Sequence, residues 1–263
     1  MKINFHLILF IYAPGLLLLL LSIFKDRFEF TNNALKLCNW SLLPGAVVIF
    51  SLLSGETIRS LWYVNLIPLL KNYPYNPFNF EVFVFLYCYL ILGLAYVFLK
   101  YIHKASIVEV FDLRFIHFPF ILKICGVLIV INIFSIYLLD FNLLLSPQKA
   151  VLEDIKSMDV KHTILFSFVT IVLGPIVEES VFRGLIYPPL YRKVGRRFAI
   201  VLTSLIWTYG HFEALYPSIQ LSIVGIFIKG VFLAWLYDRS GSLIHPLVLH
   251  MFINSWVVVY YFR

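Results

Sequence analysis

Apolar stretches of about twenty residues recur along the whole chain, and they limit the folds that it can adopt. A helix needs about 20 predominantly apolar residues to cross the hydrocarbon core of a bilayer. Eight stretches approach that length: 5–24, 40–55, 80–102, 118–139, 163–186, 197–213, 218–237 and 242–262. Of the 263 residues, 61% are hydrophobic and 13% are charged, whereas an average soluble protein is about 45–50% apolar and about 25% charged. The sequence therefore predicts an all-α, polytopic transmembrane helix bundle of about eight spans.

The remaining apolar patch, at 60–71, is short and interrupted, so we expect segment 56–79 to be extramembrane or re-entrant. The first apolar run is followed by no small-residue cleavage site, which favours a retained span over a signal peptide. Lys and Arg concentrate in alternate connections and most densely in RKVGRR at 192–197. Because basic loops stay in the cytoplasm, this pattern favours both termini on the outside.

The formal net charge of +7 would suggest a nucleic-acid partner in a soluble protein. In a membrane protein, basic loops explain the same excess, so we expect contact with the lipid bilayer and no nucleic acid. Cys38, Cys88 and Cys125 are scattered without CxxC spacing. They predict neither a disulfide framework nor a zinc site.

Three ionisable residues, Glu178, Glu179 and Arg183, lie deep inside the span at 163–186. Charges within a membrane span are expensive and mark candidate functional sites. Glu179 and Arg183 are four residues apart and can pair on one helix face. Glu178 lies about 100° around the helix from Glu179, so it must find another partner or become neutral. This leftover carboxylate makes Glu178 the strongest catalytic candidate.

Histidines in the following apolar stretches reach a similar depth. Glu178 lies about 14 residues before the basic turn and His211 about 14 after it, which places both roughly 20 Å from that membrane face. His250 and Asn254, four residues apart on one face of the last span, lie at comparable depth. We therefore expect these four side chains to converge. His245, near the start of that span, is interpreted as a capping or interfacial residue.

These residues resemble the motifs of the CAAX protease and bacteriocin-processing (CPBP, or Abi) family of intramembrane proteases. Its EExxxR motif matches Glu178, Glu179 and Arg183, and its HxxxN motif matches His250 and Asn254. The third motif of the family is FxxxH. This chain has Trp207 in place of the phenylalanine, another aromatic residue, followed by His211. Lys229, inside the span at 218–237, has no counterpart in that pattern and could snorkel or pair with a carboxylate.

The resemblance covers roughly residues 163–260, and it divides a single membrane domain, 1–263, into two parts. Residues 161–263 would form the catalytic core, with the active site buried between the last four helices. Residues 1–160 would contribute spans without recognisable motifs. The protein would be integral to the membrane and multi-pass, in the plasma membrane of a prokaryote.

The resemblance implies an endopeptidase that hydrolyses a peptide bond in a membrane-associated peptide or protein substrate, without a cofactor. Glu178 would be the base that activates water, and His211 would help to hold that water. His250 and Asn254 would stabilise the oxyanion. Glu179 and Arg183 would orient the site and balance its charge.

Alternatives remain open. Glu178, His211 and His250 form a plausible zinc-ligand set, although the chain has no HExxH sequence. The fold could also serve a non-enzymatic membrane protein with an immunity or regulatory role, or a transporter with intramembrane carboxylates. The sequence selects neither the substrate nor the oligomeric state.

Overall fold

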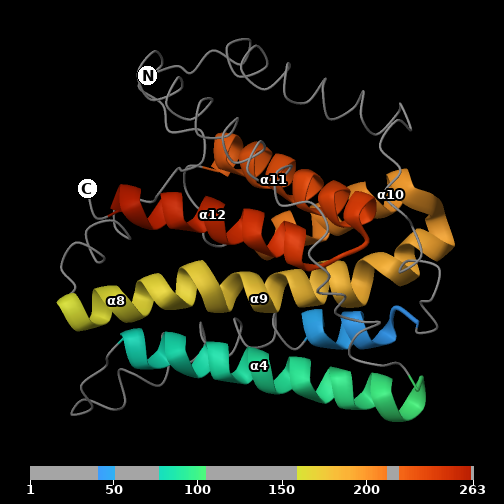
Figure 1. The fold of residues 1–263 in the computed structure, drawn as a ribbon, viewed down its shortest axis with the longest axis horizontal. Coiled ribbons are helices and arrows are strands. Elements are labelled where there is room, and N and C mark those ends of the chain that lie inside the picture. The colour runs from blue at the N-terminus through green and yellow to red at the C-terminus, as the bar shows by residue number, and fades with distance from the viewer. Residues whose placement is uncertain (1–40, 51–76, 105–158, 212–218, 262–263) are drawn as a thin grey trace.

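The computed structural model describes residues 41–50, 77–104, 159–211 and 219–261, and these are helical apart from short connections (Figure 1). The α-helices are α4 (Pro77–Ile102), α8 (Val160–Phe168), α9 (Gly174–Glu179), α10 (Tyr187–Gly210), α11 (Ile219–Ser240) and α12 (Ile244–Tyr261). Two π-helical segments, η3 (Val169–Leu173) and η4 (Ser180–Ile186), join α8, α9 and α10, and a short helix covers 43–50. The prediction of an all-α protein is confirmed for these residues, which include no strand. The predicted spans at 5–24 and 118–139, and most of segment 56–79, lie outside them.

A continuous helical run, Val160–Gly210, is long and apolar enough to cross a membrane, and it is the one such helix among the described residues. Gly195 interrupts it with a φ of 79°, a backbone conformation that glycine adopts without steric cost. This break falls within the basic sequence RKVGRR, where the prediction placed the turn between two spans. The total of eight spans stays a prediction.

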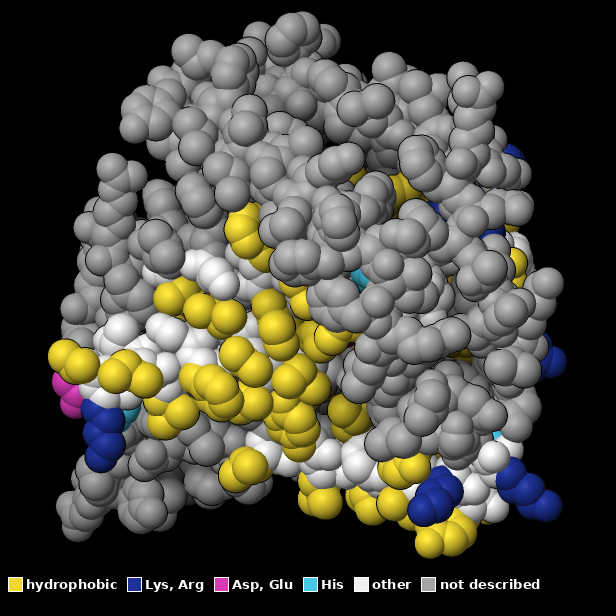
Figure 2. Space-filling model, viewed as in Figure 1, with side chains coloured by type: hydrophobic (Ala, Val, Ile, Leu, Met, Phe, Trp, Pro, Cys, Tyr) yellow, Lys and Arg dark blue, Asp and Glu magenta, His cyan; other side chains and the backbone are white. Residues whose placement is uncertain are grey.

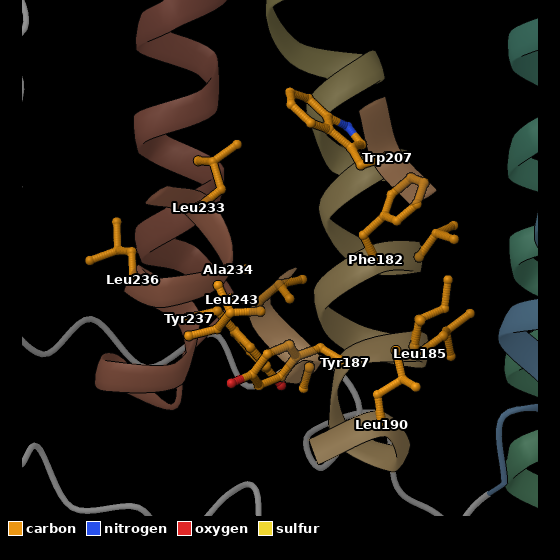
Figure 3. Close-up of a cluster of buried hydrophobic side chains, with 14 of the residues drawn as sticks. Phe182, Leu185, Tyr187, Leu190, Trp207, Leu233, Ala234, Leu236, Tyr237 and Leu243 are labelled. Carbon is orange, nitrogen blue, oxygen red and sulfur yellow. The ribbon is translucent and has the colours of Figure 1, made fainter. Parts of the chain in front are cut away.

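The run from α8 to α9 lies at the centre of the described helices (Figure 1). Helix α12 packs against η3 and α9, while α4 packs against α9 as well. Helix α11 packs against both α10 and α12. Buried side chains of η4, α10 and α11 form the hydrophobic core beside this arrangement (Figure 3).

Both π-helical segments end immediately before a residue that precedes proline. Segment η3 is followed by Gly174 and Pro175, and η4 is followed by Tyr187 and Pro188. A proline has no N–H to donate, and its ring clashes with the carbonyl four residues earlier. Widening the helix relieves such a clash, and single π turns of this kind are common at functional sites. The two prolines thus explain why bulges lie on either side of α9.

A buried polar cluster fixes the turn between η4 and the long part of α10. The Tyr187 hydroxyl donates to Asp238 Oδ1 over 2.7 Å, and Arg196 Nε lies 2.8 Å from Asp238 Oδ2. Tyr187 and Asp238 are fully buried. Because the cluster joins both sides of the Gly195 turn to the end of α11, it holds these segments in register.

Hydrophobic side chains gather in a broad band over α8, α9 and α12 on the face shown in Figure 2, with Lys and Arg side chains at its margins. Several belong to α8, where Val160 is 77% exposed and Ile164 is 65% exposed. A large exposed apolar area is unfavourable in water and suits contact with a membrane.

Gly230 allows α11 to approach α10 closely. A Cβ atom at this position would lie 2.9 Å from Cε3 of Trp207 and 3.3 Å from the Cα atom of Ser204. The Gly230 carbonyl also accepts a hydrogen bond from Arg183 Nη2 over 3.0 Å. Sequence reasoning did not single out Gly230, yet this contact places three of the site-bearing elements.

We expect Gly230→Ala to destabilise the protein. Overpacking of a filled core costs about 1–3 kcal/mol, which exceeds the ~1 kcal/mol that alanine gains over glycine within a helix. The matched control is Gly93→Ala in α4, where nothing lies within 4 Å of the added Cβ. The thermal midpoint of the purified protein in detergent should fall for Gly230→Ala and hold or rise for Gly93→Ala. Equal midpoints for the two variants would contradict this packing account.

Candidate active site

The two adjacent glutamates point to different partners, as their separation around the helix predicts. Oε1 of Glu179 accepts a hydrogen bond from Arg183 Nη1 over 3.0 Å and lies 2.8 Å from Nδ1 of His250. Glu179 and Arg183 are fully buried, with 0% and 1% of their side chains exposed. This pairing confirms the contact that their i,i+4 spacing predicts.

Glu178 instead faces the two histidines and a tryptophan. Its Oε2 atom lies 3.7 Å from His211 Nε2 and 4.0 Å from His250 Nε2. The same oxygen accepts a hydrogen bond from the indole Nε1 of Trp207. The structure therefore brings Glu178, His211 and His250 together from three segments of the chain, at the place where the sequence predicts convergence.

The Nδ1 atoms of both imidazoles lie next to acceptors. Nδ1 of His211 is 2.8 Å from the backbone carbonyl of Trp207, and Nδ1 of His250 is 2.8 Å from the Glu179 carboxylate. Each Nδ1 must therefore carry a proton. In a neutral imidazole the other nitrogen then has the lone pair, so both Nε2 atoms present lone pairs toward Glu178 unless a ring is charged.

Exposure divides the site into an accessible part and a buried part. The side chains of Glu178 and His211 are 28% and 32% exposed, whereas His250 is 5% exposed. The Glu179 and Arg183 pair lies behind them. A reactant can therefore reach Glu178 and His211, while the buried pair can only orient and balance charge.

Asn254 binds a backbone carbonyl that a proline leaves without its usual donor. The amide of Gly174 donates to the carbonyl of Val169, five residues earlier. In that register residue 175 would donate to Thr170, but Pro175 has no N–H. Nδ2 of Asn254 donates to the Thr170 carbonyl over 2.9 Å. Asn254 thus fastens α12 to the π-helical segment, on the turn of α12 next to His250.

The sequence also singled out His245 and Lys229 in the last spans. His245 is only 1% exposed, and Ser242 Oγ, rather than His245, lies 3.4 Å from the Ile244 amide at the start of α12. The interpretation of His245 as a capping or interfacial residue therefore stays a prediction.

Lys229 lies in α11 directly before Gly230 and is half-buried. In the part of the chain that the structure describes, no group of three His, Cys, Asp or Glu side chains is arranged to hold a metal ion.

Residues 160–256, which contain this whole cluster, match the family described as type II CAAX prenyl endopeptidase Rce1-like. Over these residues the chain is similar to the CAAX protease (CPBP) family, as its motifs predict. The expected resemblance is confirmed by a comparison that includes all three motifs.

Curated relatives that match this part of the chain come from bacteria and humans. YdiL of Bacillus subtilis (strain 168), named provisionally as a membrane peptidase, is 30% identical over 95 residues, which cover 36% of each chain. The membrane-embedded CAAX protease MroQ of Staphylococcus aureus (strain USA300) is 28% identical, over 36% of this chain and 39% of its own. Human CAAX prenyl protease 2 is 30% identical, over 32% of this chain and 30% of its own. The alignments thus span only 30–39% of these relatives' length. No solved structure matches significantly. Together with the apolar helix Val160–Gly210, the names indicate a membrane protein.

Sequence reasoning missed residues that support this cluster through hydrogen bonds. The motif predicts only an aromatic ring at Trp207, whereas its indole N–H donates a hydrogen bond to Glu178. Tyr89 of α4, which donates to the Leu173 carbonyl over 3.1 Å, is outside every motif. Pro175 could have been noticed, because a proline inside an apolar helix always removes one backbone donor.

The pairing of Asn254 with a proline-freed carbonyl predicts a specific coupling between two substitutions. Asn254→Ala should cost about 1–3 kcal/mol of stability, since the Thr170 carbonyl loses its donor. In a Pro175→Ala background the new amide N–H can reach that carbonyl, so the same substitution should cost less. A double-mutant cycle on thermal unfolding in detergent measures this coupling.

The control for this cycle is Ser255→Ala, on the next residue of α12. Its hydroxyl donates within its own helix to Met251, over 2.7 Å. Its effect should therefore add independently to that of Pro175→Ala. If Asn254→Ala were also strictly additive with Pro175→Ala, the proposed link through Thr170 would be wrong.

Proposed function

We propose that this protein is an intramembrane endopeptidase that hydrolyses a peptide bond in a membrane-associated peptide or protein. The observation that carries the proposal is the convergence of Glu178 with His211 and His250 inside a CAAX protease domain. An accessible carboxylate beside two imidazoles can hold and deprotonate water. The names of the curated relatives, a membrane peptidase and two CAAX proteases, support the same class of reaction.

Glu178 acts as the general base. The separations of 3.7 and 4.0 Å between its Oε2 atom and the two Nε2 atoms are too long for direct hydrogen bonds. They are short enough for one water molecule to contact both the carboxylate and His211. Glu178 takes a proton from this water while the water oxygen attacks the scissile carbonyl carbon. Glu178 then gives the proton to the leaving amine when the C–N bond breaks.

His250 and Asn254 stabilise the oxyanion that forms in between. A His250 ring that donates from Nε2 must carry a second proton, because Nδ1–H is already directed at Glu179. The negative Glu179 carboxylate supports the charged ring, and Arg183 in turn balances Glu179. Asn254 uses one amide hydrogen on Thr170, and its second hydrogen is available to the oxyanion. Preorganised donors of this kind contribute much of the rate enhancement of acyl-transfer enzymes.

The protein acts in a membrane, with several passes, and its substrate lies in or at the bilayer. The exposed hydrophobic side chains of α8, within the band in Figure 2, are the expected lipid contact. Neither a nucleic acid nor a resident cofactor takes part. We place the enzyme in a prokaryotic plasma membrane, since two of the relatives are bacterial.

Zinc-dependent hydrolysis of the peptide bond, with the same residues as metal ligands, is the second candidate mechanism. The observation that favours it is the orientation of both imidazoles, whose Nε2 lone pairs face Glu178 when the rings are neutral. A carboxylate oxygen and two imidazole nitrogens are common ligands of catalytic zinc. Against it, Oε2 of Glu178 already accepts the hydrogen bond from Trp207.

Glu178→Gln should abolish cleavage while leaving the fold intact, because the amide keeps the shape of the carboxyl group but cannot accept the proton. Removal of a general base lowers the rate by about 10²–10⁴-fold. The measurement compares the peptides released from membranes that contain the wild type or the variant. Peptides present only with the wild type identify the cleavage site.

Matched controls keep this comparison specific. Asp159→Asn retains the helix cap that Asp159 provides to the His162 amide, and His162→Gln removes a histidine outside the site. Both should give the wild-type set of peptides, whereas His211→Ala should resemble Glu178→Gln. Identical peptide sets from wild type and Glu178→Gln membranes would refute the protease and favour the non-enzymatic alternative.

Chelation separates the two mechanisms. We expect a quenched fluorescent peptide that carries the identified cleavage site to be hydrolysed at an unchanged rate after dialysis of the purified protein against 1,10-phenanthroline. Water activated by a carboxylate needs no metal. Activity that is lost on dialysis and returns with added Zn²⁺ would instead establish the zinc mechanism.

A further inference from the structure

Among the described residues, Trp207 is the only group that donates a hydrogen bond to the side chain of Glu178. Its indole Nε1–H is directed at Oε2. The imidazoles of His211 and His250 lie farther away, at 3.7 and 4.0 Å. Because their Nδ1 protons are directed elsewhere, they present no hydrogen to this oxygen while they are neutral. The indole is a donor in every protonation state of the site.

The indole ring is itself held firmly from several sides. Trp207 is 3% exposed. The Arg183 guanidinium lies 5.5 Å from the ring centre, and the His250 ring meets it edge-on at 5.7 Å. Gly230 of α11 packs so closely against the indole that a Cβ atom added at this glycine would lie 2.9 Å from the ring. A donor fixed in this way cannot rotate with the carboxylate, so it selects one orientation of Glu178.

The hydrogen bond also determines which oxygen of Glu178 is constrained. Oε2 is the atom nearest to both Nε2 atoms, and it is the atom that Trp207 holds. A carboxylate free to rotate would spend part of its time with neither oxygen beside His211. Fixing a reacting group in its productive geometry lowers the barrier by avoiding this loss of orientation.

We propose that Trp207 is a positioning residue, whose indole N–H holds the Glu178 carboxylate in the orientation required to activate water. This role rests on the proposed function of Glu178 as the base. Phenylalanine, the usual residue at this motif position, has no N–H and could not donate this hydrogen bond.

The test replaces the donor while keeping the ring. In Trp207→Phe the N–H is lost together with part of the ring, whereas incorporation of 3-benzothienylalanine at 207 replaces only the N–H by sulfur. Hydrolysis of the quenched fluorescent peptide by the purified protein in lipid vesicles should show kcat lowered by about 10- to 100-fold in both variants, as expected for a hydrogen bond to a charged group. KM should change less than about twofold, because the indole N–H faces Glu178 and binds no part of the peptide in this proposal.

Trp235→Phe is the matched control, since this tryptophan of α11 packs edge-on against Phe232, in the core outside the site. It should retain wild-type kcat. A kcat within twofold of wild type in the benzothienylalanine protein would overturn the role of Trp207. A raised KM with unchanged kcat would overturn it also, because the ring would then serve substrate binding. If Glu178→Gln keeps its activity, the proposed function fails as well, whereas an inactive Glu178→Gln beside a fully active benzothienylalanine protein refutes the positioning role alone.

Discussion

The arrangement of the C-terminal helices depends on one buried oxygen atom, Oε1 of Glu179. This oxygen accepts a hydrogen bond from Arg183 Nη1 over 3.0 Å and lies 2.8 Å from His250 Nδ1. Arg183 also donates a hydrogen bond through Nη2 to the Gly230 carbonyl over 3.0 Å. A charge buried in protein is stable only when it is paired and hydrogen-bonded. Loss of any member would leave the others without compensation. Elements α9, η4, α11 and α12 are therefore held in one relative position by electrostatic necessity as well as by packing.

The same necessity explains why two adjacent glutamates have different environments. Residues next to each other on a helix point about 100° apart, so Arg183 can neutralise Glu179 but not bind Glu178 equally well. Glu179 is fully buried and contacts both Arg183 and His250 through Oε1, whereas Glu178 is 28% exposed and lies against two imidazoles. One helix turn thus supplies both the structural charge and the reactive charge. His250 joins them, with Nδ1 toward one carboxylate and Nε2 toward the other.

The sequence predicted the features that depend on local periodicity. Apolar length predicted α11 and α12 to within a few residues, whereas the span predicted at 163–186 continues as helix up to Gly195. The i,i+4 spacing predicted the pair Glu179 and Arg183. Similar depth from the basic turn gave the approach of His211 to Glu178. The indole donor of Trp207 and the close contact at Gly230 could not be derived in the same way. They depend on how α10 and α11 rotate about their own axes, and that rotation is set by tertiary packing.

The prolines show why depth could be predicted better than orientation. A π turn accommodates one extra residue, so it barely changes how far a side chain lies from the membrane face. It does rotate every later residue by about 100° relative to an unbroken α-helix. The bulge before Pro175 therefore determines the direction in which Glu178 points relative to α8, and it also frees the Thr170 carbonyl that Asn254 binds. Pro175 thus has two effects. It turns the glutamates toward the histidines, and it frees the carbonyl through which Asn254 holds α12, and therefore His250, next to the glutamates.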